Sequence, residues 1–134
     1  MPVLPYLRLM RPANILTAIA DILLGYAVSG GVAAGLDFAF LPALRQPEAL
    51  AWLVLATIGL YGGGVVLNDA FDADLDRRER PERPIPSGAV SERAALLFGM
   101  LLLLGGVTAA AQVSAGSALL AGLVAALATV YDAY

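Results

Sequence analysis

One short stretch of the 134-residue sequence carries side chains that could bind a metal ion. An amide and three carboxylates recur there at helical spacing: Asn68, Asp69, Asp72 and Asp76. At about 100° per residue they fall within one arc of about 100° if a helix continues through them, whereas Asp74 points away. Like charges at this spacing repel one another, and a divalent cation between them would remove the repulsion. The spacing therefore predicts a metal site on one helix face.

The ligand type and the residues that follow indicate which metal and which substrate. Ligands that are all oxygen favour a hard cation, Mg²⁺ before Ca²⁺ or Mn²⁺. Mg²⁺ is usually held by one or two carboxylates together with the phosphates of a substrate. Guanidinium groups, which bind phosphate oxygens in a bidentate fork, follow at once: Arg77, Arg78, Arg80 and Arg83. This order of acidic and basic residues is typical of a site for Mg²⁺ and a diphosphate.

The whole stretch 68–88 holds ten of the 19 charged residues of the chain. Its last residues, Pro-Ile-Pro-Ser-Gly at 84–88, are expected to form a stiff, extended strap, because proline disfavours a helix there. The strap would hold the arginines over the site. The alternative is a solvated, charge-mixed loop that only anchors the topology of the protein.

Four apolar segments must position this stretch: 13–34, 49–67, 94–113 and 117–131. A membrane-spanning helix needs about 20 apolar residues, which the first three segments reach, while the fourth is shorter. None alternates with a period of two, so strands are not expected. The chain is 14% charged, against about 25% in soluble domains. The expected fold class is all-α: a polytopic membrane helical bundle of about four transmembrane helices in one domain, 1–134.

The basic residues are all arginines, and their distribution predicts an orientation. If the helices alternate, seven lie on one side, Arg8, Arg11, Arg77, Arg78, Arg80, Arg83 and Arg93, and only Arg45 lies on the other. The positive-inside rule then places the N-terminus and the loop 68–92 in the cytoplasm. We expect an integral, multi-pass protein of a bacterial cell membrane.

The composition also excludes several kinds of catalysis. The chain has no cysteine and no histidine, which removes disulfides, thiolate nucleophiles and the commonest general base. Carboxylates, tyrosine, arginine or a bound metal remain. Nothing in the chain indicates a nucleic-acid partner.

The motif NDxxDxxxD at 68–76 resembles the first aspartate-rich motif of the UbiA superfamily of intramembrane prenyltransferases. The ending RPIPSG at 83–88 and the opening RPAN at 11–14 are also similar to that superfamily. The resemblance covers nearly the whole chain. It implies a helical fold around a central cavity that opens to the cytoplasmic side and to lipid.

The resemblance implies Mg²⁺-dependent transfer of a prenyl group from an allylic polyprenyl diphosphate to a nucleophilic acceptor, whose identity stays open. Asp69, Asp72 and Asp76 would be catalytic and would hold Mg²⁺ together with Asn68. The substrate-binding residues that it implies are Asn14, Asn68, Arg77, Arg78, Arg83 and Tyr131. Family members carry a second aspartate motif on a later helix, which is missing here, so we expect the N-terminal part of a longer protein.

Two functions compete with catalysis. The chain could be a non-catalytic, isoprenoid-binding or degenerate relative, which would lack the second aspartate motif throughout. It could also be a transporter, but transporters place their charges midway through the spans, and here most charges lie at one helix end.

Several residues within the apolar segments have two interpretations. Asp21 lines a cavity, or it is protonated and bonded to a neighbouring helix. Gly62, Gly63 and Gly64 form a hinge, or they let two helices pack closely. Trp52 and Tyr61 suit an interfacial anchor and a packing residue. Ser91 is expected to cap the third helix, with Glu92 in its first turn.

Overall fold

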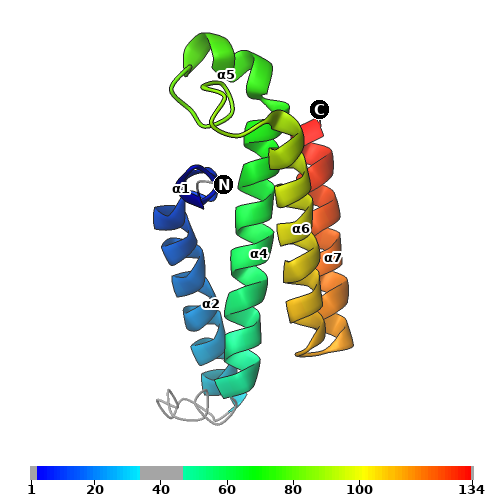
Figure 1. The fold of residues 1–134 in the computed structure, drawn as a ribbon. Helices are drawn as coiled ribbons and strands as arrows, with labels where there is room; N and C mark the ends of the chain where they lie inside the picture. The colour runs from blue at the N-terminus through cyan, green and yellow to red at the C-terminus, as the bar shows by residue number, and fades with distance from the viewer. Residues whose placement is uncertain (1–2, 34–46, 134) are drawn as a thin grey trace.

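The computed structural model describes residues 3–33 and 47–133, and every regular element in those residues is a helix (Figure 1). The helices are α1 (Val3–Leu9), α2 (Pro12–Ala33), α4 (Pro47–Phe71), α5 (Ala73–Glu79), α6 (Glu92–Ala111) and α7 (Ala115–Ala133). No strand occurs in the part described, which confirms the predicted all-α class. Arg45, expected on the opposite side from the other arginines, lies outside the described residues.

Within residues 3–33 and 47–133, three helical stretches are long and apolar enough to cross a membrane: Glu48–Phe71, Glu92–Ala111 and Ala115–Asp132. The apolar stretch of α2, Pro12–Val28, is shorter. Large apolar side chains stay exposed on these helices, and Leu119 on α7 is 78% exposed. Such faces suit lipid or further helices, so length and composition both fit a membrane-embedded bundle.

Helix α4 is the centre of the bundle, with α2 on one side and α6 and α7 on the other (Figure 1). Its contact with α6 is so close that glycine is required at the crossing. A Cβ atom at Gly59 would lie 2.6 Å from the Leu102 carbonyl oxygen, and one at Gly63 would lie 2.9 Å from that of Gly99. The close-packing interpretation therefore holds for Gly63, since small residues let membrane helices approach.

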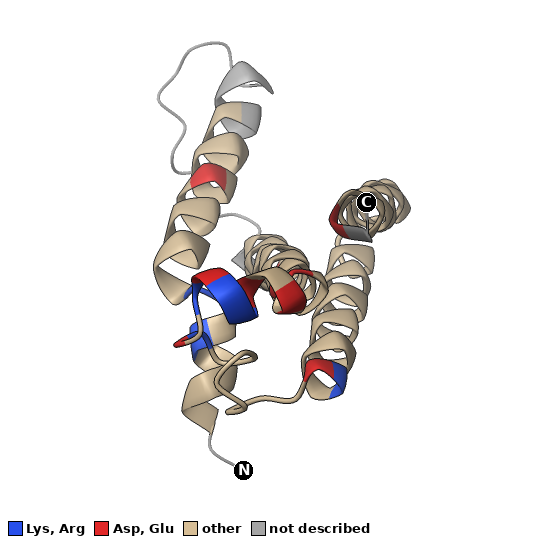
Figure 2. Ribbon diagram, turned by 90° about the horizontal axis from the view of Figure 1, so that it is seen from above, with Lys and Arg blue, Asp and Glu red and all other residues tan. Residues whose placement is uncertain are grey.

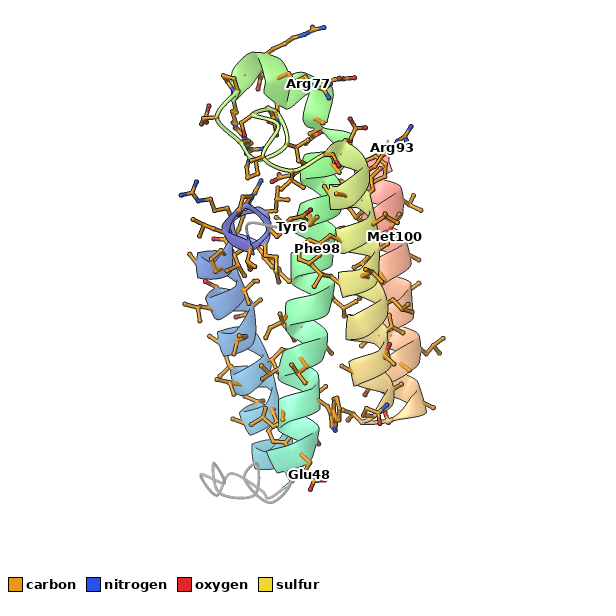
Figure 3. The ribbon with its side chains drawn as sticks, viewed as in Figure 1. Tyr6, Glu48, Arg77, Arg93, Phe98 and Met100 are labelled. Carbon is orange, nitrogen blue, oxygen red and sulfur yellow. The ribbon has the colours of Figure 1, made fainter. Side chains whose placement is uncertain are left out.

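Helices α1 and α2 meet at Arg11, whose φ of +49° is left-handed and is rarely adopted by an L-residue other than glycine. Pro12 then begins α2 at the position where its missing N–H costs nothing. The turn directs α1 back over α4, where Leu9 is buried. Tyr6 of α1 packs edge-to-face on Phe98 of α6, with ring centroids 5.2 Å apart (Figure 3).

We had expected a loop over the whole stretch 68–92, but part of it is helical. Residues 68–71 complete α4, and α5 follows after a single break at Asp72. The chain then turns back and enters α6, whose first turn is capped as predicted: the Ser91 hydroxyl oxygen accepts a hydrogen bond from the Ala94 N–H at 3.3 Å.

The prediction of an extended strap at 84–88 is wrong. These residues form consecutive turns, in which the N–H groups of Ser87 and Gly88 donate to the carbonyls of Arg83 and Ile85. Proline excludes a helix but allows turns, and Gly88 has the positive φ, +77°, that such a chain reversal needs. Ile85 and Val90 are buried in the cluster that also holds Leu9 and Val66, so burial of apolar side chains fixes the compact shape.

Candidate functional site

Most of the charged residues that the structure describes gather at one end of the bundle, over the α1–α2 junction, α5 and the start of α6 (Figure 2), whereas Glu48 lies at the other end (Figure 3). Figure 1 shows the end of α7 at the same end. An apolar cluster that includes Val66, Ala70 and Ala73 lies beneath this charged layer. The layer therefore rests on a packed core, and side chains at the end of α4 have fixed positions.

Two aspartates of the motif, Asp69 and Asp76, are almost fully buried, with exposed fractions of 5% and 4%. Arg83 joins them: its Nη1 lies 2.5 Å from Asp76 Oδ2 and 3.4 Å from Asp69 Oδ1. Arg11 binds Asp69 from the other helix junction, with 2.6 Å between Nη2 and Oδ1. Two arginines thus compensate two buried carboxylates, which would be costly to bury alone.

The environment of Arg83 keeps it charged. Burial by itself lowers the pKa of its guanidinium, but the hydrogen bond to Asp76 and the charges of Asp69 and Asp76 outweigh that effect. The net result is a pKa above the ordinary arginine value. Arg83 is therefore a permanent cation at the centre of the charged layer.

The other half of the motif is open. The Asn68 amide donates to Asp72 Oδ2 at 2.8 Å, and the Asp72 side chain is exposed. Asn68 also lines a groove of about 540 Å³ between α4 and α7. At the same end the groove is lined by Arg11, Tyr131 and Asp132, and its remaining wall is largely apolar: Leu60, Val65, Val124, Leu127 and Ala128, among others.

The remaining predicted residues lie at the surface. Arg77 pairs with Asp74 and, at 3.4 Å, with Glu92 Oε2, which ties α5 to the start of α6. Arg78 is exposed on α5, and Asn14 is exposed on the first turn of α2. None of these three lines the groove.

Residues 16–134 match the model of the UbiA prenyltransferase family. The chain belongs to this family. It is similar to a digeranylgeranylglyceryl phosphate synthase of Methanothrix thermoacetophila, with 42% identity over 75% of this chain and 33% of that protein. The proteins of the same name from Natronomonas pharaonis and Methanoculleus marisnigri are 38% and 34% identical, over 71% and 82% of this chain and 30% and 35% of theirs. No solved structure shows a significant match.

This UbiA-family chain spans about a third of the length of the curated relatives that it matches. Its apolar helices and its family together make it an integral membrane protein.

The single arc predicted for the four residues of the motif is split in this UbiA-family structure. Asp69 and Asp76 face arginines, whereas Asn68 and Asp72 bind each other in the open. In the part of the chain that is described, no three acidic side chains converge on one point. Asn68 and Asp69 are consecutive residues of α4, so their side chains already point about 100° apart, and the helix breaks at Asp72 before Asp76 is reached. Asn68 and Asp72 still offer adjacent oxygen ligands, which fit a hard cation.

Arg11 and Asp132 both lie at the site, and we had predicted neither of them for it. The RPAN pattern drew attention to the start of the first helix, but its resemblance indicated Asn14 as the residue that faces the site. Contact between Arg11 and Asp69 depends on the left-handed backbone at Arg11, and no local pattern of side chains signals that conformation.

Proposed function

We propose that this chain is part of a Mg²⁺-dependent prenyltransferase that moves a prenyl group from an allylic prenyl diphosphate to a nucleophilic acceptor. The observation that carries the proposal is the groove beside α4, which has polar and charged side chains at one end and an apolar wall along the helices. A prenyl diphosphate has the same two parts: an anionic head and an apolar chain. Family membership supports the same reaction class.

Residues at the polar end of the groove and in the charged layer around it would divide the work of binding. Asn68 and Asp72 would hold Mg²⁺, which would stabilise the negative charge of the leaving diphosphate. Arg83 would bind phosphate oxygens through the nitrogens that it does not use for Asp69 and Asp76. Arg77 and Arg78 are further phosphate-binding candidates, at the rim.

The apolar wall of the groove would receive the prenyl chain. Leu60, Val124 and Leu127 line it on the membrane side of the charged layer. A chain bound there would keep water from the carbocation that forms as the diphosphate leaves. Tyr131, 82% exposed at the polar end, would contact the diphosphate or the acceptor.

The name of the relatives favours one acceptor class. Digeranylgeranylglyceryl phosphate is a glyceryl phosphate with two prenyl groups, so a prenylated glyceryl phosphate is the first acceptor to test. We further propose that the polar end of the groove faces the cytoplasm, because the arginines of the described residues gather there.

A non-catalytic, isoprenoid-binding relative is the second candidate. The observation that favours it is that Asp69 and Asp76 already have arginine partners, and that no three carboxylates converge in the described residues.

Prenyl transfer by the full-length protein in membrane vesicles separates the two candidates. An isotope-labelled geranylgeranyl diphosphate is supplied with Mg²⁺ and a panel of acceptors that includes geranylgeranylglyceryl phosphate, and products are identified by mass spectrometry. The proposal predicts a prenylated product that disappears with EDTA. Donor binding without product or diphosphate release across the panel would support the non-catalytic candidate.

A further inference from the structure

The first aspartate of the motif has a different setting from the others. Asp69 is buried and is paired with two arginines, and although none of the motif's aspartates lines the groove, its neighbour Asn68 and its partner Arg11 both do. We propose that Asp69 is a positioning residue, which orients Arg11 and Arg83 toward the phosphate groups of the substrate and does not bind the metal. This inference rests on the function proposed above and assigns Arg11 a direct role in binding the diphosphate.

A single oxygen of Asp69 holds two segments that are far apart in the sequence. Its Oδ1 lies 2.6 Å from Arg11 Nη2, across 58 positions, and 3.4 Å from Arg83 Nη1, across 14 positions. The carboxylate therefore fixes the α1–α2 junction and the segment after α5 against the end of α4. Since the Asp69 side chain is only 7% exposed, both contacts form away from bulk water, where charge-assisted hydrogen bonds are strong.

Arg11 presents the rest of its guanidinium to the groove. Its contact with Asp69 uses Nη2, which leaves Nη1 and Nε for another acceptor. The side chain is 40% exposed and belongs to the groove lining. Arg11 thus lies between the Asp69 carboxylate and the groove. This arrangement holds the guanidinium in place for an anionic ligand in the groove.

Arg83 is held in the same way. A single nitrogen, Nη1, serves both Asp69 and Asp76, so its Nε and Nη2 stay available. Without Asp69, only Asp76 would orient this guanidinium, and the side chain could rotate about that one contact.

The same contacts argue against Asp69 as a metal ligand. Its Oδ1 is already shared by two guanidinium groups, and their positive charges would repel a divalent cation at this position. Asp72, in contrast, is exposed beside Asn68, and the described residues pair it with no arginine.

The test separates metal binding from diphosphate binding in the purified full-length protein. Binding of Mn²⁺ alone is followed by electron paramagnetic resonance, and binding of inorganic diphosphate with Mg²⁺ by calorimetry. The variants are Asp69→Asn, Arg11→Gln and the double variant, with Asp72→Asn as a metal-site comparison. Asp74→Asn is the matched control, because Asp74 is exposed and its one ion pair with a described residue is with Arg77.

We expect Asp69→Asn and Arg11→Gln each to weaken diphosphate binding by roughly tenfold or more, the usual effect of a lost charge-assisted hydrogen bond. Mn²⁺ affinity should stay within about threefold of wild type in both, which is below 1 kcal/mol by the same conversion. The double variant should lose less than the product of the two single losses, because Asp69 acts partly through Arg11. Asp74→Asn should bind both probes as wild type does.

Two results would overturn the inference. A loss of Mn²⁺ affinity in Asp69→Asn as large as that in Asp72→Asn would make Asp69 a ligand. Arg11 is half-exposed, and Arg11→Gln leaves the buried carboxylate in place. Unchanged diphosphate binding in this variant would remove Arg11 from the site. If wild type itself binds no diphosphate with Mg²⁺, the proposed function fails, and this outcome is distinct from both.

Discussion

Four aspartates within eight positions lie in four different environments. Asp69 is buried against Arg11 and Arg83, and Asp76 is buried against Arg83 alone. Asp72 accepts a hydrogen bond from Asn68, and Asp74 is exposed beside Arg77. Residues of one type can therefore have different roles here, because each role follows from the partner and not from the carboxylate itself.

Asp72 and Asp74 provide the clearest contrast at this scale. Replacing Asp72 by alanine should reduce Mg²⁺-dependent diphosphate release by roughly 100-fold or more, the scale of a lost group that stabilises transition-state charge. Asp74→Ala should reduce it by less than about threefold, a difference below 1 kcal/mol. Release is measured with an enzyme-coupled diphosphate assay on the full-length protein, with membrane insertion checked for both variants. Equal losses in the two variants would contradict the assignment of Asp72.

At the scale of the helices, the site depends on the contact between α4 and α6. The end of α4 carries Asn68 and Asp69, and α6 begins at Glu92, the partner of Arg77. Gly59 on α4 lies against Gly106 on α6, where a Cβ atom would come within 2.7 Å of the Gly106 backbone. At this crossing, close contact of the two backbones therefore limits how far the helices can approach each other.

A single methyl group at this crossing should be destabilising. Gly59→Ala must push α4 from α6, because the atoms that it meets are backbone atoms, and overpacking of this kind costs about 1–3 kcal/mol. The matched control is Gly105→Ala, at a position on α6 where a Cβ atom would meet nothing within 4 Å. Thermal unfolding in detergent, followed by circular dichroism, compares the two. A Gly59→Ala protein as stable as Gly105→Ala would refute the close crossing.

The sequence was sufficient to predict the helical class and the Ser91 cap, because apolar length and cap chemistry are local properties. It was not sufficient for the end of α4. The single arc assumed a continuous helix, and the strap at 84–88 assumed that proline keeps the chain extended. The structure has a break at Asp72, and its turns around Ile85 follow from burial. Neither Arg11's backbone conformation nor its contact with Asp69 could be predicted from local spacing.

At the scale of the whole molecule, charge and apolar surface are separated along the bundle. The arginines of α1, α5 and α6 lie at one end, and the helices below expose leucines, including Leu104, Leu119 and Leu127. This separation fits the proposed function, in which an apolar substrate enters from lipid and its anionic head binds at the membrane surface. By the positive-inside rule, we propose that this surface faces the cytoplasm.

The orientation is testable because the chain has no native cysteine. Arg78→Cys, on the exposed side of α5, should react with a membrane-impermeant maleimide only after the cytoplasmic face is opened. Ser114→Cys, between α6 and α7, should react from the outside of intact cells. If the sequence of the full-length protein contains cysteines, these are first replaced. The reverse pattern would invert the proposed topology.

Binding of a prenyl diphosphate to the purified full-length protein, with and without Mg²⁺, tests the central claim most directly. The site proposed at Asn68, Asp72 and Arg83 predicts binding that strengthens at least about tenfold with Mg²⁺, as expected when the metal bridges carboxylates and phosphates. It also predicts that Asp72→Asn removes the metal dependence but leaves a weaker, arginine-based affinity. Binding that is equal with Mg²⁺ and with EDTA, or no binding at all, would contradict a metal-diphosphate site at the end of α4.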